Sequence, residues 1–236
     1  MPRALRRQLV RAAGHSKVAW LGMILLLAST TLQAARQDYH FSRVGGSEGL
    51  LQRTIQAVAQ DEQGFVWIAT QGGLQRFDGQ RFLPIGHDPA QPNALPESFV
   101  TALALDATGR LWIGSNSHFL SSLELSSGRI TAGATRGDPQ RDRVVAILAA
   151  PDGSLWIGTG SGIERFQPDN GQRTEVLRLT SAPRADRRGM PRSIQLAHDG
   201  EDRLLAATDG GLFRIDPATL RSERVGRASV IQSVHR

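Results

Sequence analysis

The sequence predicts an all-β fold, a β-propeller, and three observations lead to that prediction. A segment of 16 residues recurs at Gly64–Gly79, Gly109–Glu124 and Gly153–Pro168, with a degenerate fourth copy at Asp202–Pro217. The tryptophans of the first three copies lie 45 and 44 residues apart, which is the period of propeller blades. An alternating apolar run precedes each copy, and no window has the sustained apolar spacing of an amphipathic helix.

Each repeat is predicted to form four antiparallel strands, A to D. Strand A is the alternating run, strand B is the W-I-[AG]-[ST] segment, strand C is L-x-R-F or its equivalent, and strand D is exemplified by Gln80–Ile85. The A–B turn reads D-x-x-G in the first two repeats, where Asp caps the turn and Gly adopts a positive φ. The repeat positions that we expect to be structural are Asp61, Asp106, Gly64, Gly109, Gly153, Trp67, Trp112 and Trp156.

The strand A runs set the predicted blade boundaries. They are Thr54–Gln60, Phe99–Leu105, Val144–Ala150, Ser193–Ala197 and an isolated Val230–Val234. The predicted blades are residues 51–92, 97–138, 142–188 and 192–226, with the start of a fifth at 229–236. Four repeats plus one strand predict an incomplete propeller with open edges, and open edges favour self-association. A closed four-bladed ring is the alternative.

The N-terminus has the three-part layout of a secretory signal. A basic region (Arg3–Lys17) precedes 11 apolar residues (Val18–Ala28) and a small, polar segment (Ser29–Ala35). Because a bilayer core needs about 20 residues, we predict a signal peptide over 1–34, with an uncleaved anchor as the alternative. Either interpretation exports residues 35–236, so a periplasmic location is expected.

The charge balance argues against nucleic-acid binding. The formal net charge is +6, but residues beyond 34 comprise 23 basic and 22 acidic side chains with no clustered basic stripe. The chain has no cysteine, which excludes disulfides, thiolate metal sites and a cysteine nucleophile.

The repeat segments resemble the two-component regulator propeller repeat. The resemblance is close over Phe41–Phe82 and good over Gly109–Ser115 and Gly153–Phe166. It is weaker in the fourth copy, where Leu205 replaces tryptophan, and in the second, where Ser117-His118-Phe119 replaces the family's G-L. The resemblance implies a periplasmic sensor region that precedes a transmembrane helix and a histidine kinase or diguanylate cyclase output.

No segment with the features of those later parts follows Leu50, so we expect a sensor propeller truncated before its membrane and output domains. Membrane contact would then come only through the N-terminal signal or a missing C-terminal helix. The alternative is a secreted propeller that scaffolds protein–protein contacts.

No catalytic, metal or cofactor site is predicted. The six histidines lie at no metal-ligand spacing, and no nucleophile elbow or phosphate-binding loop occurs. A glycosidase-like propeller is a weaker alternative, because Asp106–Trp112 is similar to a sialidase Asp-box but Tyr39 is the only tyrosine. The chain is therefore predicted not to be an enzyme.

A small ligand or a protein partner is expected at the face formed by the D–A connections. These connections include the proline-rich Gly86–Glu97 and the basic Thr180–Pro191. The tryptophans are interpreted as packing between blades rather than as a sugar-stacking platform. Arg76 and Arg165, at equivalent positions of strand C, are interpreted as ladder or inter-blade contacts rather than ligand clamps.

Overall fold

The computed structural model of the chain describes residues 43–88, 90–91, 93–133, 135–179, 193–200 and 203–226. The chain divides into two compact units, Met1–Arg43 and Val44–Arg236, and every described strand belongs to the second. Among the described residues, no helix has the length and apolar character needed to cross a bilayer.

Several predictions fall on residues outside the described ranges. They concern the signal peptide at 1–34, the connection Thr180–Pro191 and the fifth strand A at Val230–Val234. These assignments therefore stay predictions.

The described part of the second unit forms four antiparallel sheets of four strands each, and the prediction of an all-β propeller with four repeats is confirmed. The first sheet comprises β1 (Ile55–Gln60), β2 (Val66–Thr70), β3 (Gly73–Phe77) and β4 (Phe82–Ile85). The second comprises β5 (Val100–Leu105), β6 (Arg110–Ser115), β7 (Leu120–Glu124) and β8 (Arg129–Ala132). The third comprises β9 (Val144–Ala149), β10 (Leu155–Thr159), β11 (Gly162–Gln167) and β12 (Gln172–Arg178). The fourth comprises β13 (Ile194–His198), β14 (Leu204–Thr208), β15 (Gly211–Ile215) and β16 (Ser222–Gly226).

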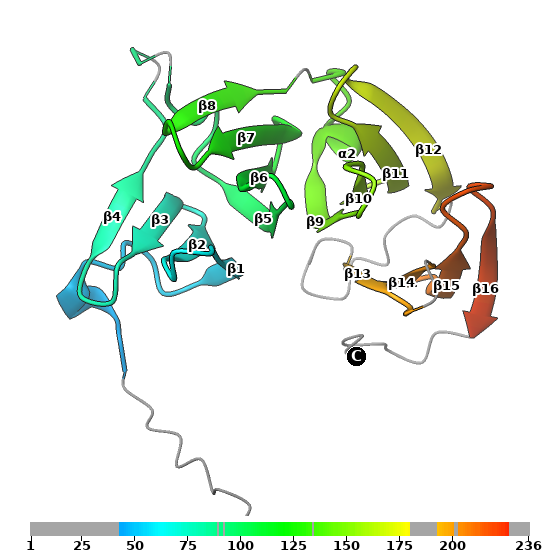
Figure 1. The fold of residues 1–236 in the computed structure, drawn as a ribbon, viewed down its shortest axis with the longest axis horizontal. Helices are drawn as coiled ribbons and strands as arrows, with labels where there is room; N and C mark the ends of the chain where they lie inside the picture. The colour runs from blue at the N-terminus through cyan, green and yellow to red at the C-terminus, as the bar shows by residue number, and fades with distance from the viewer. Residues whose placement is uncertain are drawn as a thin grey trace, which may run out of the picture. The chain divides into compact units, whose positions relative to one another are not determined.

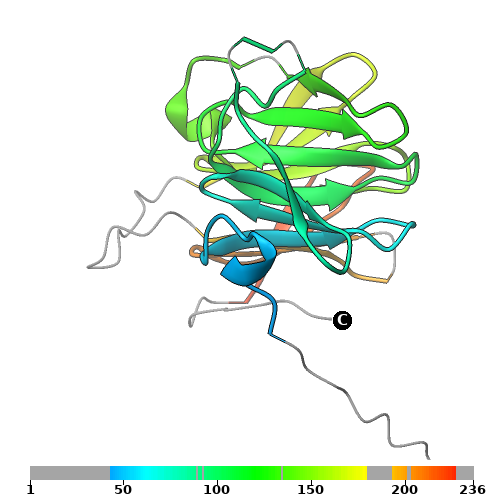
Figure 2. The same cartoon turned by 90° about the vertical axis from the view of Figure 1, so that its left-hand side faces the viewer.

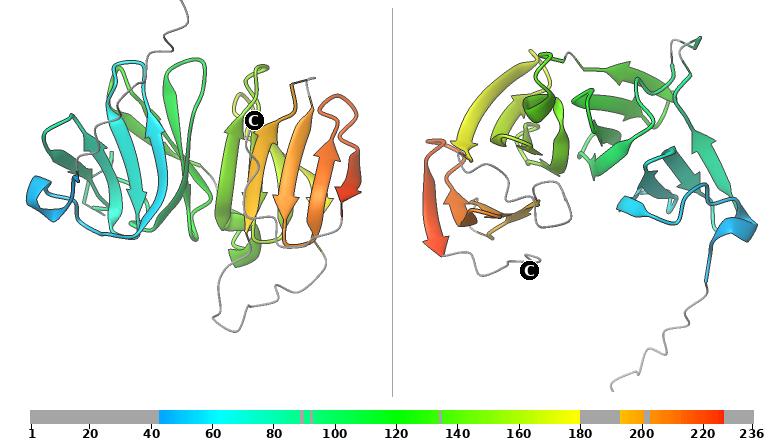
Figure 3. Two further views of the ribbon diagram at one scale, coloured as in Figure 1. Left: turned by 90° about the horizontal axis from the view of Figure 1, so that it is seen from below. Right: turned by 180° about the vertical axis from the view of Figure 1, so that it is seen from behind.

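Within each sheet the strands pair in sequence order, so strands A to D of every repeat form a simple meander. Each sheet lies beside the next one along the chain (Figure 1). Seen from below, the strands of neighbouring sheets run along a common direction (Figure 3, left). The A–B and C–D turns therefore gather at one end of the sheets, and the B–C turns and D–A connections gather at the other.

The A–B turns form as the D-x-x-G pattern predicts. The Asp61 Oδ1 atom accepts hydrogen bonds from the backbone N–H groups of Gln63 (3.1 Å) and Phe65 (2.9 Å). Gly64 has a φ of +88°, a left-handed conformation that favours glycine. Asp106 and Gly109 repeat this turn in the second sheet, where Asp106 accepts from Thr108 and Arg110.

The apolar core lies between successive sheets rather than inside any one sheet. The first junction buries Trp67, Leu74, Val100, Leu111 and Ile113 together with four further apolar residues. The second and third junctions are built in the same way around Val144, Leu155 and Ile157, and around Trp156, Ile194 and Leu204. Each sheet thus depends on its neighbour for burial, as in other repeat folds.

Close approach between sheets explains the small residue in W-I-[AG]-[ST]. A Cβ atom added to Gly114 would lie 2.5 Å from Val144 Cγ1, an atom of the third sheet. A Cβ atom on Gly158 would likewise lie 2.8 Å from Ile194 Cγ2, an atom of the fourth. Strand B therefore needs a residue with little or no side chain where strand A of the next sheet crosses it.

In the part of the chain that the structure describes, a 3-10 helix and a short α-helix flank the sheets. The 3-10 helix η2 (Gly46–Glu48) lies beside the first sheet (Figure 2), and the segment after it is bound by Gln75 of β3. The Gln75 side chain donates to the Gly49 carbonyl and accepts from the Leu51 N–H. Helix α2 (Pro139–Asp142) connects the second sheet to the third.

The second repeat departs from the pattern at the B–C turn, where the sequence also departs. Phe119 takes the glycine position with a positive φ of +55°, and its backbone N–H donates to the Asp142 carbonyl at 2.9 Å. Its ring is buried and packs edge-on against Phe166 of the third sheet. The Phe119 side chain is therefore part of the apolar core of the second junction, at a turn position where the other repeats have a glycine without a side chain.

Candidate functional site

The predicted tryptophans lie in the junctions between sheets, each facing the sheet that follows. Trp67, Trp112 and Trp156 are all at most 5% exposed, and each belongs to the apolar cluster shared with the next sheet. This burial agrees with packing between blades.

Two of these tryptophans are also hydrogen-bonded to the aspartate of the A–B turn. The Trp67 indole N–H donates to Asp61 Oδ2 at 2.8 Å, and the Trp112 indole N–H donates to Asp106 Oδ2 at 2.8 Å. The bond satisfies a buried indole and fixes the turn against the strand. This bond was not predicted from the sequence, although Asp and Trp are six residues apart in both repeats and that spacing is its signal.

In the third repeat, the strand C arginine forms an ion pair and several hydrogen bonds. Arg165 pairs in register with Trp156, and its Cζ atom lies 5.6 Å from the indole centroid. Its guanidinium forms an ion pair with Asp152 and donates to Ser154 Oγ at 3.1 Å. It also donates to the Pro217 carbonyl of the fourth sheet at 2.9 Å, so it closes the third junction as an inter-blade contact.

In the first repeat, the equivalent arginine has no such partners. Arg76 pairs in register with Trp67, and its Cζ atom lies 4.5 Å from the Phe65 ring centroid. Among the described residues, its side chain makes no hydrogen bond or ion pair, and its Nε atom is buried without a partner. Arg143 Nε is the other buried side-chain nitrogen that has no hydrogen-bond partner among the described residues. Arg143 lines neither of the clefts described below.

The local sequence explains the difference between the two arginines. Asp152 lies four residues before Trp156, and the residue four before Trp67 is Gln63. Ser154, which receives the Arg165 Nε–H, is replaced by Phe65. The first repeat therefore supplies an aromatic ring where the third supplies an acid and a hydroxyl.

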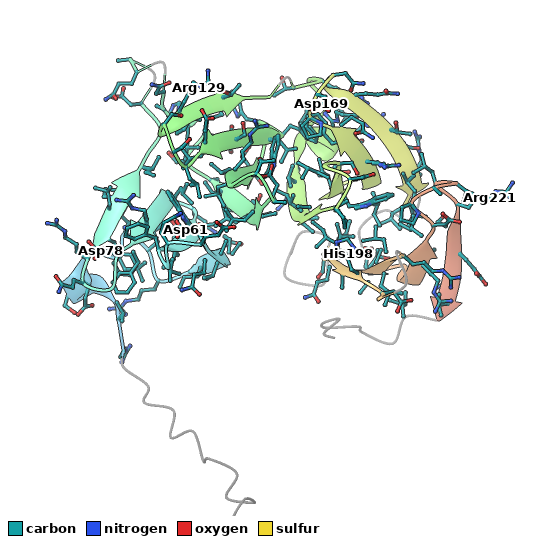
Figure 4. All side chains as sticks on the ribbon, in the orientation of Figure 1. Asp61, Asp78, Arg129, Asp169, His198 and Arg221 are labelled. Atoms are coloured by element: carbon teal, nitrogen blue, oxygen red, sulfur yellow. The ribbon has the colours of Figure 1, made fainter. Side chains whose placement is uncertain are left out.

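A cleft of about 920 Å³ occupies the first junction at the end where the A–B and C–D turns gather. Arg76, Trp67 and Phe65 line it from the first sheet, and Arg110 and Leu125 line it from the second. Figure 4 labels Asp61, which lies in the A–B turn of the first sheet at the same end.

Most of the acidic side chains that line this cleft already accept hydrogen bonds from the protein. Asp61 is 7% exposed and accepts from two backbone N–H groups and an indole. Burial would raise the pKa of Asp106, but hydrogen bonds from Thr108 and Trp112 outweigh it and lower that pKa. Hydrogen bonding from Ser127 and the charge of Arg129 lower the pKa of Glu124. The exposed Glu62 is the remaining acid of the lining.

The second junction contains a smaller cleft of about 360 Å³, lined by Trp112, Phe166 and Ser122. Ser122 pairs in register with Trp112 and takes the place of the strand C arginine. The charged groups of this lining include Glu124 and Arg129, which pair with each other at 3.3 Å.

A buried ionic cluster secures the same junction. Arg173 is 4% exposed and binds Glu164 at 2.8 Å and Asp142 at 3.0 Å, while its Cζ atom lies 3.5 Å from the Phe119 ring centroid. Arg141 adds a second ion pair to Glu164 at 2.9 Å. Burial would raise the pKa of Asp142, but its bonds with Arg173 and the Arg136 N–H hold that pKa below its usual range. The sequence analysis did not anticipate this cluster.

The predicted ligand face includes the D–A connection of the first repeat. His87 Nδ1 lies 2.7 Å from the Leu95 carbonyl, and Leu95 is buried in the first junction, so this part of Gly86–Glu97 is anchored. Within the described part of the chain, no group of three His, Cys, Asp or Glu side chains has the geometry of a metal site.

A comparison with protein families gives one match. The family described as "Two component regulator propeller" matches residues 49–72 and 94–117, which cover the B strands and A–B turns of the first two sheets. These two segments match two-component regulator propeller repeats. None of the curated proteins compared with the chain matches it.

Solved structures with the same fold include two kinds of protein. The extracellular domain of a putative hybrid two component system from B. thetaiotaomicron aligns with a TM-score of 0.61 and 22% identity, over 78% of this chain and 26% of that chain. A virginiamycin B lyase from Staphylococcus aureus aligns with a TM-score of 0.55 and 13% identity, over 76% of this chain and 59% of that chain. At such identities the likeness establishes the propeller fold, and this chain spans about a quarter of the length of the first structure.

Proposed function

We propose that this propeller region is the ligand-sensing part of an exported signal-transduction protein, without catalysis of its own. The observation that carries the proposal is the contrast between two equivalent junctions. The third is closed by Arg165, which bridges to the fourth sheet, whereas the first retains an open cleft of about 920 Å³ beside an arginine without a described partner.

Two further observations support this function. The repeats belong to the two-component regulator propeller type, and the aligned hybrid two component structure is an extracellular domain. The N-terminal segment has the layout of an export signal, which supports a periplasmic location.

A protein-binding scaffold is the second candidate function, and one observation favours it. Val58 and Leu51 are 58% and 56% exposed, and neither belongs to the apolar clusters of the junctions. In the second and third sheets, the residues equivalent to Val58 are Leu103 and Ile147, which pack against a neighbouring sheet. Exposed apolar side chains at such a position suit a partner protein.

Hydrogen exchange of the full chain, with and without a panel of small metabolites, tests the two candidates. Ligand sensing predicts that a bound metabolite slows exchange in the turns at 61–65 and 106–110. A scaffold predicts no protection by small molecules and, instead, protection of β1 on self-association or partner binding. Protection confined to 86–97 would place the ligand at the face formed by the D–A connections and contradict the cleft.

A further inference from the structure

We propose that the cleft of the first junction is a carboxylate-binding site in which Arg76 anchors a small organic acid. The inference rests on the proposed ligand-sensing function and names the ligand's chemical class. Its starting point is the comparison of Arg76 with Arg165, two arginines at the same position of the same strand.

The third repeat indicates what a strand C arginine binds when a partner is present. The Arg165 guanidinium forms an ion pair with the carboxylate of Asp152, which lies in the A–B turn of its own repeat. The A–B turns of the two repeats share a backbone pattern, with Gly64 N–H bonded to the Asp61 carbonyl and Gly153 N–H to the Ala150 carbonyl. The first repeat has Gln63 at the position of Asp152, so the carboxylate that binds the arginine in the third repeat has no counterpart there. In the fourth repeat the equivalent arginine, Arg214, lies 3.4 Å from Asp199, which takes the position of Asp61. In the first repeat Asp61 Oδ2 instead accepts from the Trp67 indole.

The surroundings of Arg76 stabilise its positive charge, which can bind a carboxylate. The Phe65 ring lies beneath the guanidinium and stabilises it through a cation–π contact at 4.5 Å. The Arg76 Nε atom is buried and out of reach of a ligand in the cleft, so the terminal Nη groups are the donors available to an anion. The planar guanidinium can donate two parallel hydrogen bonds to one carboxylate.

The remainder of the cleft selects for a small acid with an apolar body. Trp67, Phe65, Leu83 and Ile85 contribute apolar surface from the first sheet. Arg110 contributes a positive charge from the second sheet and lies beside Glu124, whose pKa it helps to lower. Asp61 and Asp106 accept hydrogen bonds within their own turns, and the exposed Glu62 also lines the cleft. The volume of about 920 Å³ accommodates a metabolite of ordinary size.

Calorimetric titration of the full chain tests the inference with benzoate as the carboxylate probe. Benzamide, which has the same shape without the charge, and inorganic phosphate serve as comparison probes. We expect benzoate to bind to the wild type more tightly than either comparison probe. Arg76→Gln should weaken benzoate by about tenfold or more, and Arg76→Lys, which keeps the charge but loses the two-pronged geometry, by several-fold.

Two variants make the test independent of folding defects. Gln63→Asp supplies an internal carboxylate at the position of Asp152, so it should compete with benzoate and weaken its binding while leaving the fold intact. Arg81→Gln removes an 85%-exposed arginine of the same sheet and should leave the affinity within about twofold.

The outcomes separate this inference from the proposed function. Equal binding of benzamide and benzoate, tighter binding of phosphate, or unchanged benzoate affinity in Arg76→Gln and Gln63→Asp would overturn the carboxylate site. Metabolite protection of the turns at 61–65 and 106–110 would leave the sensing function standing in that case. If neither benzoate nor any metabolite binds, both proposals fail together.

Discussion

The first and third junctions of the propeller are built from the same strand positions but differ in how the strand C arginine is used. At the third junction, Arg165 bonds to Asp152, Ser154 and the Pro217 carbonyl and ties two sheets together. At the first, the Arg76 guanidinium lies over the Phe65 ring, has no hydrogen-bond partner among the described residues, and lines an open cleft. The difference indicates that repeats diverge by changing partners around a fixed residue while the backbone is kept.

The largest expected effect comes from the tryptophans of the two junctions. Trp156→Ala should lower the free energy of unfolding by about 3–5 kcal/mol, because a fully packed aromatic ring leaves a cavity. Trp67→Ala should cost less, because part of its surroundings is already a cleft. Urea denaturation followed by circular dichroism measures both, and equal losses would contradict an open first junction.

The second largest effect is a difference in stability between alanine variants of the two strand C arginines. Arg165→Ala removes charge-assisted hydrogen bonds and should cost about 1.5–3 kcal/mol of stability. Arg76→Ala removes an unpartnered buried donor together with one cation–π contact, so it should change stability by less than about 1 kcal/mol. Denaturation under the same conditions gives both values, and the reverse order would show that Arg76 is the structural residue of the pair.

A smaller effect is expected from converting the first junction toward the third. Gln63→Asp should pair with Arg76 and raise stability by about 0.2–1 kcal/mol, the range of a partly exposed ion pair. The gain should shrink at 1 M salt, where exposed charges are screened. In the double variant Gln63→Asp, Arg76→Ala the gain should vanish, and its persistence would rule out the pair.

The smallest effect concerns pH at the third junction. Burial would raise the pKa of Asp152, but its hydrogen bonds with Ser154 and the charge of Arg165 outweigh burial, and the pKa is lowered. A lowered folded pKa stabilises the protein above about pH 4, the unfolded value for aspartate, and that stabilisation is lost as pH falls through the folded pKa. Asp152 is 52% exposed, so solvent screening keeps the effect small.

Thermal unfolding at pH 6 and at pH 3 measures this contribution. The wild type should lose more of its Tm between these values than Asp152→Asn does. Asp106 and Asp142 titrate in both proteins and cancel in the comparison. An identical loss in the two proteins would separate the Arg165 contact from the ionisation of Asp152.

The sequence by itself determined the blades. Strand alternation, the D-x-x-G turn and the recurring tryptophan are local patterns, and the backbone follows local patterns directly, as the bonds of Asp61 with Gln63 and Phe65 illustrate. The placement of the tryptophans between blades was also predictable, because a large apolar residue at the same position of every repeat must face the neighbouring repeat.

Only the tertiary structure decided how polar groups pair across junctions. The Arg165 bond to Pro217 joins residues 52 apart in sequence, and Arg173 reaches Asp142 across 31 residues. No periodicity encodes such contacts, because they depend on which side chains neighbouring sheets bring together. The unpartnered state of Arg76 is of the same kind, since the arginines of L-Q-R-F and I-E-R-F take the same strand position and differ in the partners that the fold brings to them.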